Sequence, residues 1–291
     1  MPATSAPTAA VSRRSLLAGL AGLALMPGRT AWASASPSAS PWAEGQRSRV
    51  RLLDGGPEGA VRLAGLEIAL SEGFKTYWRH PGDSGIPPTL DWSGSVNLAA
   101  AEVLWPAPMR FEDGGGTSFG YAGGVILPVR ATPLEPDRPV ALRLNLAYGV
   151  CKDICIPARA DLALALAGTT TAEAGRIGDA LRRVPRKAAL GASEPLAVLA
   201  VAPVAGQAAL TVEARAPAGA QLFVEGPEDW FLSAGEGVPQ GSADGATLRF
   251  PVEIVERPKQ PAGSVPLLLT LVSSETAVEV EAGLDAGALP R

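Results

Sequence analysis

Residues 141–166 read ALRLNLAYGVCKDICIPARADLALAL and contain both cysteines of the 291-residue chain, Cys151 and Cys155. Leucine occupies every second position on either side of the cysteines, at 142, 144 and 146 and again at 162, 164 and 166. Such alternation is typical of half-buried β-strands, because successive side chains point to opposite faces of a sheet. The segment therefore predicts two strands joined by an antiparallel hairpin or a tight bend.

The alternation also predicts which face the cysteines occupy. Continued inward, it puts both cysteines in phase with Arg143 and Asp161 and opposite the leucines, so we expect both thiols to be accessible. On a straight strand their Cα atoms would be about 13 Å apart, whereas a disulfide requires about 4.4–6.8 Å. The chain must therefore turn at residues 152–154 before the cysteines can bond.

The pair admits three chemical interpretations at this point. A redox pair needs proximity, because one thiolate resolves a mixed disulfide on the other, and Lys152 is a neighbouring cation of the kind that lowers a thiol pKa. A structural disulfide is the second interpretation, although closing a loop of about five residues contributes only roughly 2 kcal/mol.

A metal site is the third interpretation. Zinc takes four ligands, and beyond residue 33 the chain offers one histidine, His80, and one methionine, Met109, besides its cysteines. Two cysteines alone are enough only for linear Cu(I). We therefore expect no metal and no cofactor, and we expect His80 to be an ordinary loop residue.

The composition favours a fold of many short strands. Hydrophobic residues make up 47% of the chain, which is enough for well-formed cores, and 33 glycines and 27 prolines suit strands joined by turns. The net charge is −4 and no basic block is present, which argues against a nucleic-acid partner. No Ser-His-Asp arrangement, phosphate-binding loop or paired-carboxylate motif supports hydrolase or nucleotide chemistry.

Strand patterns lie on both sides of one helical pattern. VRLAGLEIAL at 61–70 precedes it, TLRFPVEIVE at 247–256 follows it, and Ile177, Leu181 and Val184 fall on its apolar stripe. This order predicts an all-β fold of two sandwich domains joined by a short helical linker, with a single larger sandwich as the alternative. The predicted ranges are 45–168 for the first domain, 169–191 for the linker and 192–291 for the second domain.

The first 33 residues have the pattern of an export signal. Arg13 and Arg14 precede an apolar run of about a dozen residues, and small residues follow at Ala31 and Ala33. Paired arginines are typical of the twin-arginine route, so we predict export by that route and a periplasmic location, where disulfides persist. Residues 34–44 are predicted to be a disordered tether, and no later apolar run reaches the roughly 18 residues that span a membrane.

Several segments together resemble one known family. YGVCKDICIPARADL at 148–162 resembles the cysteine hairpin in the amino-terminal periplasmic region of DsbD-type protein-disulfide reductases. The resemblance is strongest to the ScsB-like branch, which is associated with copper tolerance. It extends to GFKTYWRHPGDSGIPPTLDWSGSVNL at 73–98, VLWPAPMRFEDGGGTSFGYAGGVILPVR at 103–130 and LFVEGPEDWFL at 222–232.

The resemblance implies immunoglobulin-like sandwiches and a cysteine pair that alternates between dithiol and disulfide. On this basis Cys151 and Cys155 are the catalytic pair, with Cys155 attacking partner disulfides and Cys151 resolving the mixed disulfide. The implied partners are a membrane disulfide reductase and periplasmic thioredoxin-like proteins. In the family an aromatic loop caps the cysteines, and Phe119 or Tyr121 is the candidate for that role here, with packing in the core as the more frequent alternative for such aromatics.

Two features depart from the family pattern. The cysteines are closer together than in the DsbD amino-terminal domain, and the 291 residues contain neither the membrane electron-transfer domain nor the thioredoxin domain. We therefore expect either a separate membrane protein that reduces this thiol-disulfide oxidoreductase component, or a function that has shifted to binding. The alternative hypothesis is a non-catalytic periplasmic module that binds a partner protein or Cu(I) and holds a structural disulfide.

Overall fold

The computed structural model describes residues 37–113, 116–166, 169, 171–241, 247–258, 263–285, 287 and 289. The predicted export signal at 1–33, with its paired arginines, lies outside these residues. The described part of the predicted tether, residues 37–44, does not lie free. The Ser40 N–H donates to the Leu52 carbonyl at 2.8 Å, and the Ser40 hydroxyl accepts from the Leu52 N–H at 3.0 Å. This segment is therefore bound to strand β2 (Ser48–Glu58), which contains Leu52.

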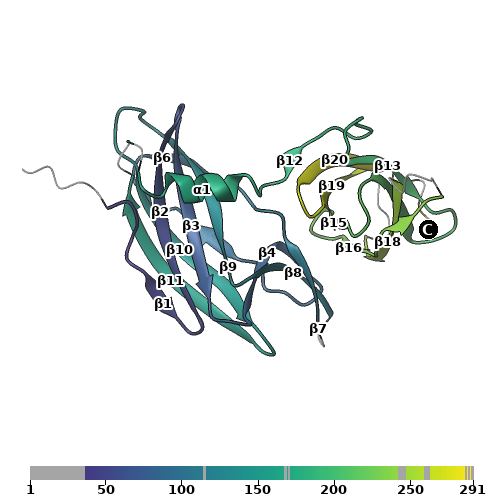
Figure 1. The fold of residues 1–291 in the computed structure, drawn as a ribbon, viewed down its shortest axis with the longest axis horizontal. Helices are drawn as coiled ribbons and strands as arrows, with labels where there is room; N and C mark the ends of the chain where they lie inside the picture. The colour runs from purple at the N-terminus through teal and green to yellow at the C-terminus, as the bar shows by residue number, and fades with distance from the viewer. Residues whose placement is uncertain are drawn as a thin grey trace, which may run out of the picture. The chain divides into compact units, whose positions relative to one another are not determined.

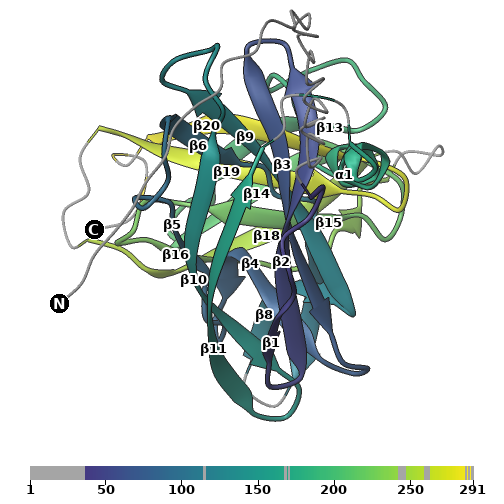
Figure 2. The ribbon, with the colours of Figure 1, turned by 90° about the vertical axis from the view of Figure 1, so that its left-hand side faces the viewer.

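The cysteine segment forms the predicted antiparallel hairpin. Strand β10 (Ala141–Cys151) pairs with β11 (Cys155–Ala165) in continuous register up to the pair of Cys151 with Cys155. Figure 2 shows the two strands side by side along their length. All six alternating leucines are buried, so the face predicted for them is confirmed.

Two sheets enclose the first core. The bounds of their other strands are β1 Ala43–Gly45, β2 Ser48–Glu58, β3 Val61–Leu70, β4 Lys75–Gly82, β5 Thr89–Asp91, β6 Leu98–Val103, β7 Met109–Asp113, β8 Gly116–Ala122 and β9 Gly124–Pro133. One sheet has the order β1-β2-β3-β9-β6, and the other has the order β11-β10-β4-β8-β7 with β5 beside β10. Leu52, Leu66 and Leu127 of the first sheet meet Leu144 and Trp78 of the second.

The predicted helix is present and packs on the first sheet. Helix α1 (Ala174–Leu181) lies against β2 and β9 (Figure 1). Its residue Ile177 is fully buried and packs with Leu53 and Leu63. A Cβ atom at Gly65 would lie 3.2 Å from Cγ1 of Ile177, so the glycine leaves room for this contact. The helical part of the predicted linker is therefore attached to the sheet.

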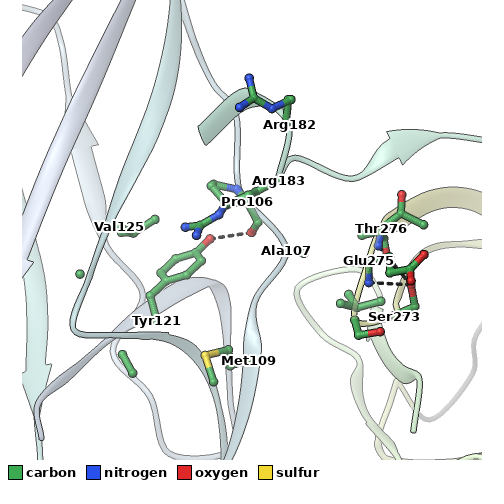
Figure 3. A pocket seen from close by; sticks show the side chains of 15 residues that line it. Pro106, Ala107, Met109, Tyr121, Val125, Arg182, Arg183, Ser273, Glu275 and Thr276 are labelled. Atoms are coloured by element: carbon green, nitrogen blue, oxygen red, sulfur yellow. Dashed lines mark hydrogen bonds between the residues drawn. The ribbon is translucent and has the colours of Figure 1, made fainter. Parts of the chain in front are cut away.

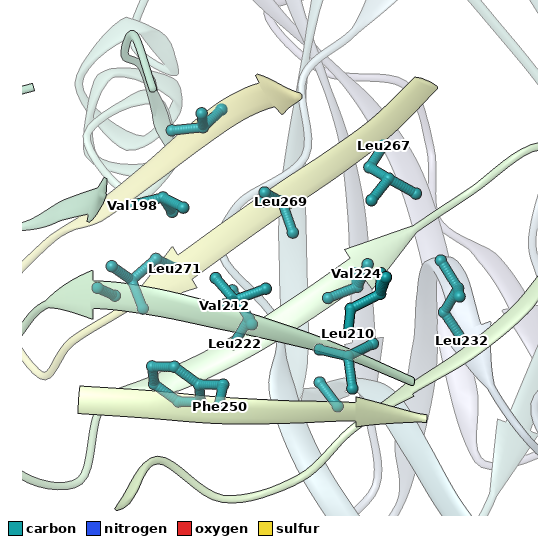
Figure 4. Close-up of a cluster of buried hydrophobic side chains, with 14 of the residues drawn as sticks. Val198, Leu210, Val212, Leu222, Val224, Leu232, Phe250, Leu267, Leu269 and Leu271 are labelled. Atoms are coloured by element: carbon teal, nitrogen blue, oxygen red, sulfur yellow. The ribbon is translucent and has the colours of Figure 1, made fainter. Parts of the chain in front are cut away.

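Two further sheets follow the helix. Their bounds are β12 Arg186–Lys187, β13 Ala197–Pro203, β14 Ala209–Arg215, β15 Gln221–Glu225, β16 Phe231–Ala234, β17 Val238–Pro239, β18 Thr247–Glu256, β19 Ser264–Val272 and β20 Ala277–Asp285. One sheet has the order β12-β20-β19-β15, and the other has the order β13-β14-β18-β16 with β17 beside β18. Their apolar faces meet in a second core that contains Val212, Phe250 and Leu269 (Figure 4). The fold is therefore nearly all-β, as predicted.

One aromatic side chain from the later sheets belongs to the first core. Residues 35–291 form one compact unit, and in it the fully buried ring of Phe223 on β15 packs with the first core. The centroid of this ring lies 5.8 Å from that of Trp78 and 4.9 Å from that of Phe119, edge-on in both cases. The first core is therefore completed by a residue from β15.

Ion pairs accompany this contact. Arg79 of β4 pairs with Glu225 of β15 at 2.6 Å and with Glu279 of β20 at 2.5 Å. Burial lowers the pKa of Arg79, but the hydrogen bonds and charges of the two glutamates outweigh burial and raise that pKa. The guanidinium therefore stays charged and links β4 to two later strands.

The position of Phe223 generates a test. Phe223→Ala is expected to lower the free energy of unfolding by about 3–5 kcal/mol, because it removes a fully buried ring and leaves a cavity. Phe231→Ala is the matched control, since Phe231 is only half-buried. Urea unfolding measures both variants. A loss for Phe223→Ala no larger than that for Phe231→Ala would contradict the packing.

Candidate redox site

Cys151 and Cys155 form a disulfide across the end of the β10–β11 hairpin. Their Cα atoms are 4.2 Å apart, because the three intervening residues turn the chain as predicted. The two residues differ in exposure: Cys151 is 1% exposed, whereas Cys155 is exposed. Because an attacking thiolate must reach a sulfur from solvent, Cys155 is the accessible end of this disulfide.

The expectation that both thiols are accessible is correct for Cys155 and wrong for Cys151. Cys151 does lie on the face opposite the leucines, in unbroken register with the rest of β10. Strand β4 covers this end of β10, however, with Lys75 directly opposite Cys151. Alternation along β4 then puts Tyr77 on the same face as Lys75, beside the buried sulfur.

Tyr77 is the site residue that the sequence analysis missed. Its hydroxyl donates a hydrogen bond to Sγ of Cys151 at 2.8 Å and lies 2.9 Å from Sγ of Cys155. The side chain is 3% exposed. Sequence spacing could not identify it, because its place depends on the pairing of two strands that are far apart in the chain.

Two glycines flank the Tyr77 ring. A Cβ atom at Gly149 would lie 2.9 Å from Cε2 of the ring, and a Cβ atom at Gly85 would lie 2.7 Å from Cδ1. Gly85 belongs to the loop that follows β4, and the same Gly149 Cβ would lie 3.2 Å from Cβ of Ile86. The ring therefore occupies a slot between β10 and this loop, and both glycines are needed to keep the slot open.

Two lysines lie close to the hairpin end. Lys75 is 8% exposed, and its ammonium donates to the hydroxyl of Ser118 at 2.8 Å and lies 5.0 Å from the ring centroid of Phe111. The end of the Lys152 side chain lies over Gly73, 3.5 Å from the position of a Cβ atom there. Positive charge near a thiol favours the thiolate, but these contacts of the two side chains are with Ser118, Phe111 and Gly73 and not with the sulfurs.

Phe119 and Tyr121 lie in the core and do not form the cap that they were candidates for. The expected loop is strand β8, which places both side chains on buried positions. Phe119 packs on Phe223. Tyr121 donates its hydroxyl to the Pro106 carbonyl at 2.8 Å, and burial raises its pKa well above the usual value. Figure 3 shows this hydrogen bond at a pocket that Arg183 also lines.

His80 lies at the end of β4, away from the sulfurs. Its ring centroid is 5.9 Å from that of Phe119. Burial lowers the pKa of His80, which favours the neutral imidazole. Within the described ranges, no group of three or more histidine, cysteine, aspartate or glutamate residues is placed to hold a metal ion.

No helix in the described residues is long and apolar enough to cross a membrane.

A family model matches the part of the chain that contains this site. Residues 50–167 match the family described as "Thiol:disulfide interchange protein DsbD, N-terminal". No curated protein sequence matches the chain. Both cysteines and Tyr77 fall within the matched residues.

Comparison with solved structures covers more of the chain and concerns its fold. The N-terminal periplasmic domain of ScsB from Proteus mirabilis is similar with a TM-score of 0.67 and 19% sequence identity, over 86% of this chain and 99% of that chain. A conserved domain protein from Bacillus anthracis has a TM-score of 0.26 and 10% identity, over 86% of this chain and 91% of that chain, which is too low to support an argument. The ScsB likeness therefore shows a shared fold that extends beyond residue 167.

The difference in exposure predicts unequal reactivity after reduction. In the reduced protein, iodoacetamide is expected to modify Cys155 at least about tenfold faster than Cys151, because reaction requires an accessible thiolate. Peptide mass spectrometry over time measures the two rates. In the urea-unfolded control the two rates should become similar. Faster modification of Cys151 in the folded protein would contradict the assignment of the buried sulfur.

Proposed function

Residues 50–167 of this chain are a DsbD-type N-terminal domain, and on this premise we propose that the protein exchanges thiols and disulfides with partner proteins through Cys151 and Cys155. The observation that carries the proposal is the asymmetry of the disulfide, which joins an exposed cysteine residue to a buried one. A staple needs no accessible sulfur, whereas an exchanging pair does.

The asymmetry supports a different proposed role for each cysteine. When the disulfide is reduced, a partner thiolate attacks Sγ of Cys155, the bond between the two cysteines breaks, and its electron pair stays on Cys151. The second thiolate of the partner then attacks the partner's own sulfur and releases Cys155. Two electrons have passed to this protein, and the partner leaves as a disulfide.

Onward transfer runs through the same sulfurs. The Cys155 thiolate attacks the disulfide of an acceptor and forms a mixed disulfide with it. Cys151 then attacks Sγ of Cys155 and releases the acceptor in its reduced form. Cys155 is therefore the attacking residue and Cys151 the resolving residue.

The proposed partners are a membrane disulfide reductase as donor and periplasmic thioredoxin-like proteins as acceptors. The family description of residues 50–167 as a thiol:disulfide interchange protein supports this choice. Ile154, next to Cys155 in the hairpin turn, is 78% exposed and offers apolar contact to a docking protein.

We also propose a periplasmic location and a division into two immunoglobulin-like domains. The location is supported by the export pattern at 1–33, and the related ScsB domain is described as periplasmic. Arg13 and Arg14 are the basis for proposing the twin-arginine route. The division into 45–168 and 192–291 is supported by a hydrophobic core in each part, with Phe223 of the second part packed into the core of the first.

A trapping experiment tests the exchange. Cys151→Ala removes the resolving thiol, so a mixed disulfide between Cys155 and a partner is expected to accumulate in cells. It should appear as a band of higher mass that disappears when reductant is added. Cys155→Ala should trap much less, because the remaining sulfur is buried.

The double variant Cys151→Ala/Cys155→Ala is the control and should give no adduct. If neither single variant forms a reducible adduct, exchange is ruled out, and the result supports the alternative that the disulfide is structural. If Cys155→Ala traps while Cys151→Ala does not, exchange stands but the two roles are reversed.

A further inference from the structure

Tyr77 contacts both sulfurs of the disulfide, which makes it part of the reacting site. We infer that Tyr77 is a catalytic hydrogen-bond donor, which stabilises the thiolate that forms on Cys151 when Cys155 is attacked. This inference rests on the proposed thiol–disulfide exchange and adds a residue to it.

The two O–S distances allow one hydroxyl to serve either sulfur. They are 2.8 Å to Cys151 and 2.9 Å to Cys155, so the donor reaches both without movement of the ring. A neutral disulfide sulfur is a weak acceptor, whereas hydrogen bonds to charged acceptors are about twice as strong as neutral ones. The contact therefore strengthens as charge develops on the leaving sulfur, which is the condition for lowering a barrier.

The burial of Cys151 makes this donor necessary. As the leaving group in the attack, Cys151 receives the electron pair of the broken bond, yet it is 1% exposed. A charge formed away from water is costly unless a protein group satisfies it. Tyr77 supplies the hydrogen bond that this charge needs.

The step needs no proton from Tyr77. The hydroxyl donates a hydrogen bond to the sulfur on which the negative charge forms. The step balances as a displacement: a bond forms between the incoming sulfur and Cys155, the bond to Cys151 breaks, and its electron pair stays on Cys151.

The Tyr77 ring is held in the position that its role as hydrogen-bond donor requires. Gly149 and Gly85 leave no room for a Cβ atom, since each would come within 3 Å of a Tyr77 ring carbon. A methyl group at Gly149 must therefore displace the ring and its hydroxyl, which gives a second way to remove the donor without changing Tyr77.

Tyr77→Phe tests the inference with dithiothreitol as the attacking thiol. The rate constant for reduction of the disulfide is expected to fall about tenfold, the size expected for loss of one hydrogen bond to a developing charge. The pH midpoint for alkylation of Cys151 in the reduced protein, followed by peptide mass spectrometry, should also move upward, because its thiolate loses a donor. A purely structural role would not move this midpoint.

Tyr148→Phe is the matched control. Tyr148 lies on the same strand as Cys151 and is equally buried, but its hydroxyl bonds to Ser48 at 2.8 Å. Its loss should leave both the rate and the pH midpoint unchanged. Gly149→Ala should change both in the direction of Tyr77→Phe, and this variant decides the result if Tyr77→Phe does not fold.

A wild-type rate and pH midpoint in Tyr77→Phe or in Gly149→Ala would overturn the role of Tyr77. That outcome leaves the proposed exchange intact, provided that Cys151→Ala still traps a partner. Absence of trapped partners, with the expected slowing in Tyr77→Phe, would instead refute exchange in the cell and leave the local chemistry of Tyr77 standing.

Discussion

The pairing of β4 with β10, with Lys75 opposite Cys151, is the constraint on which the chemistry of this site depends. It places Tyr77 over Gly149, with its hydroxyl within hydrogen-bond distance of both sulfurs. It also covers one end of the disulfide, so that Cys151 is buried and Cys155 is exposed. A shift of one residue in this pairing would turn Tyr77 to the other face of the sheet and remove the donor.

Contacts on the opposite face of β4 help to hold this strand in place. Trp78, the neighbour of Tyr77, points to the opposite face and is fully buried in the first core. There it packs against Phe223, which β15 contributes, while Arg79 forms ion pairs with Glu225 and Glu279. Tyr77 and Trp78 thus lie on opposite faces of β4, one at the redox site and the other in the core. The later sheets therefore contribute to holding the strand that carries the hydrogen-bond donor.

Local pattern was sufficient for much of this structure. Alternating leucines predicted the hairpin, and the helical stripe predicted the position of Ile177, because both signals repeat within one element. The pairing of distant strands has no such local signal. For that reason Tyr77 was missed and Cys151 was wrongly expected to be accessible. Phe119 and Tyr121 were candidates for a cap because the resemblance implies an aromatic loop over the cysteines, yet both residues lie in strand β8.

The reduction potential of the Cys151–Cys155 pair tests the central claim most directly. Structural disulfides lie below about −300 mV, whereas disulfides that exchange have higher potentials. Equilibration of the protein with glutathione or dithiothreitol buffers, followed by alkylation of free thiols, measures this potential. The account predicts a value clearly above about −300 mV, because the Tyr77 hydroxyl favours the thiolate of the reduced state. A value well below that limit would mean that the disulfide is a structural link and would contradict the account.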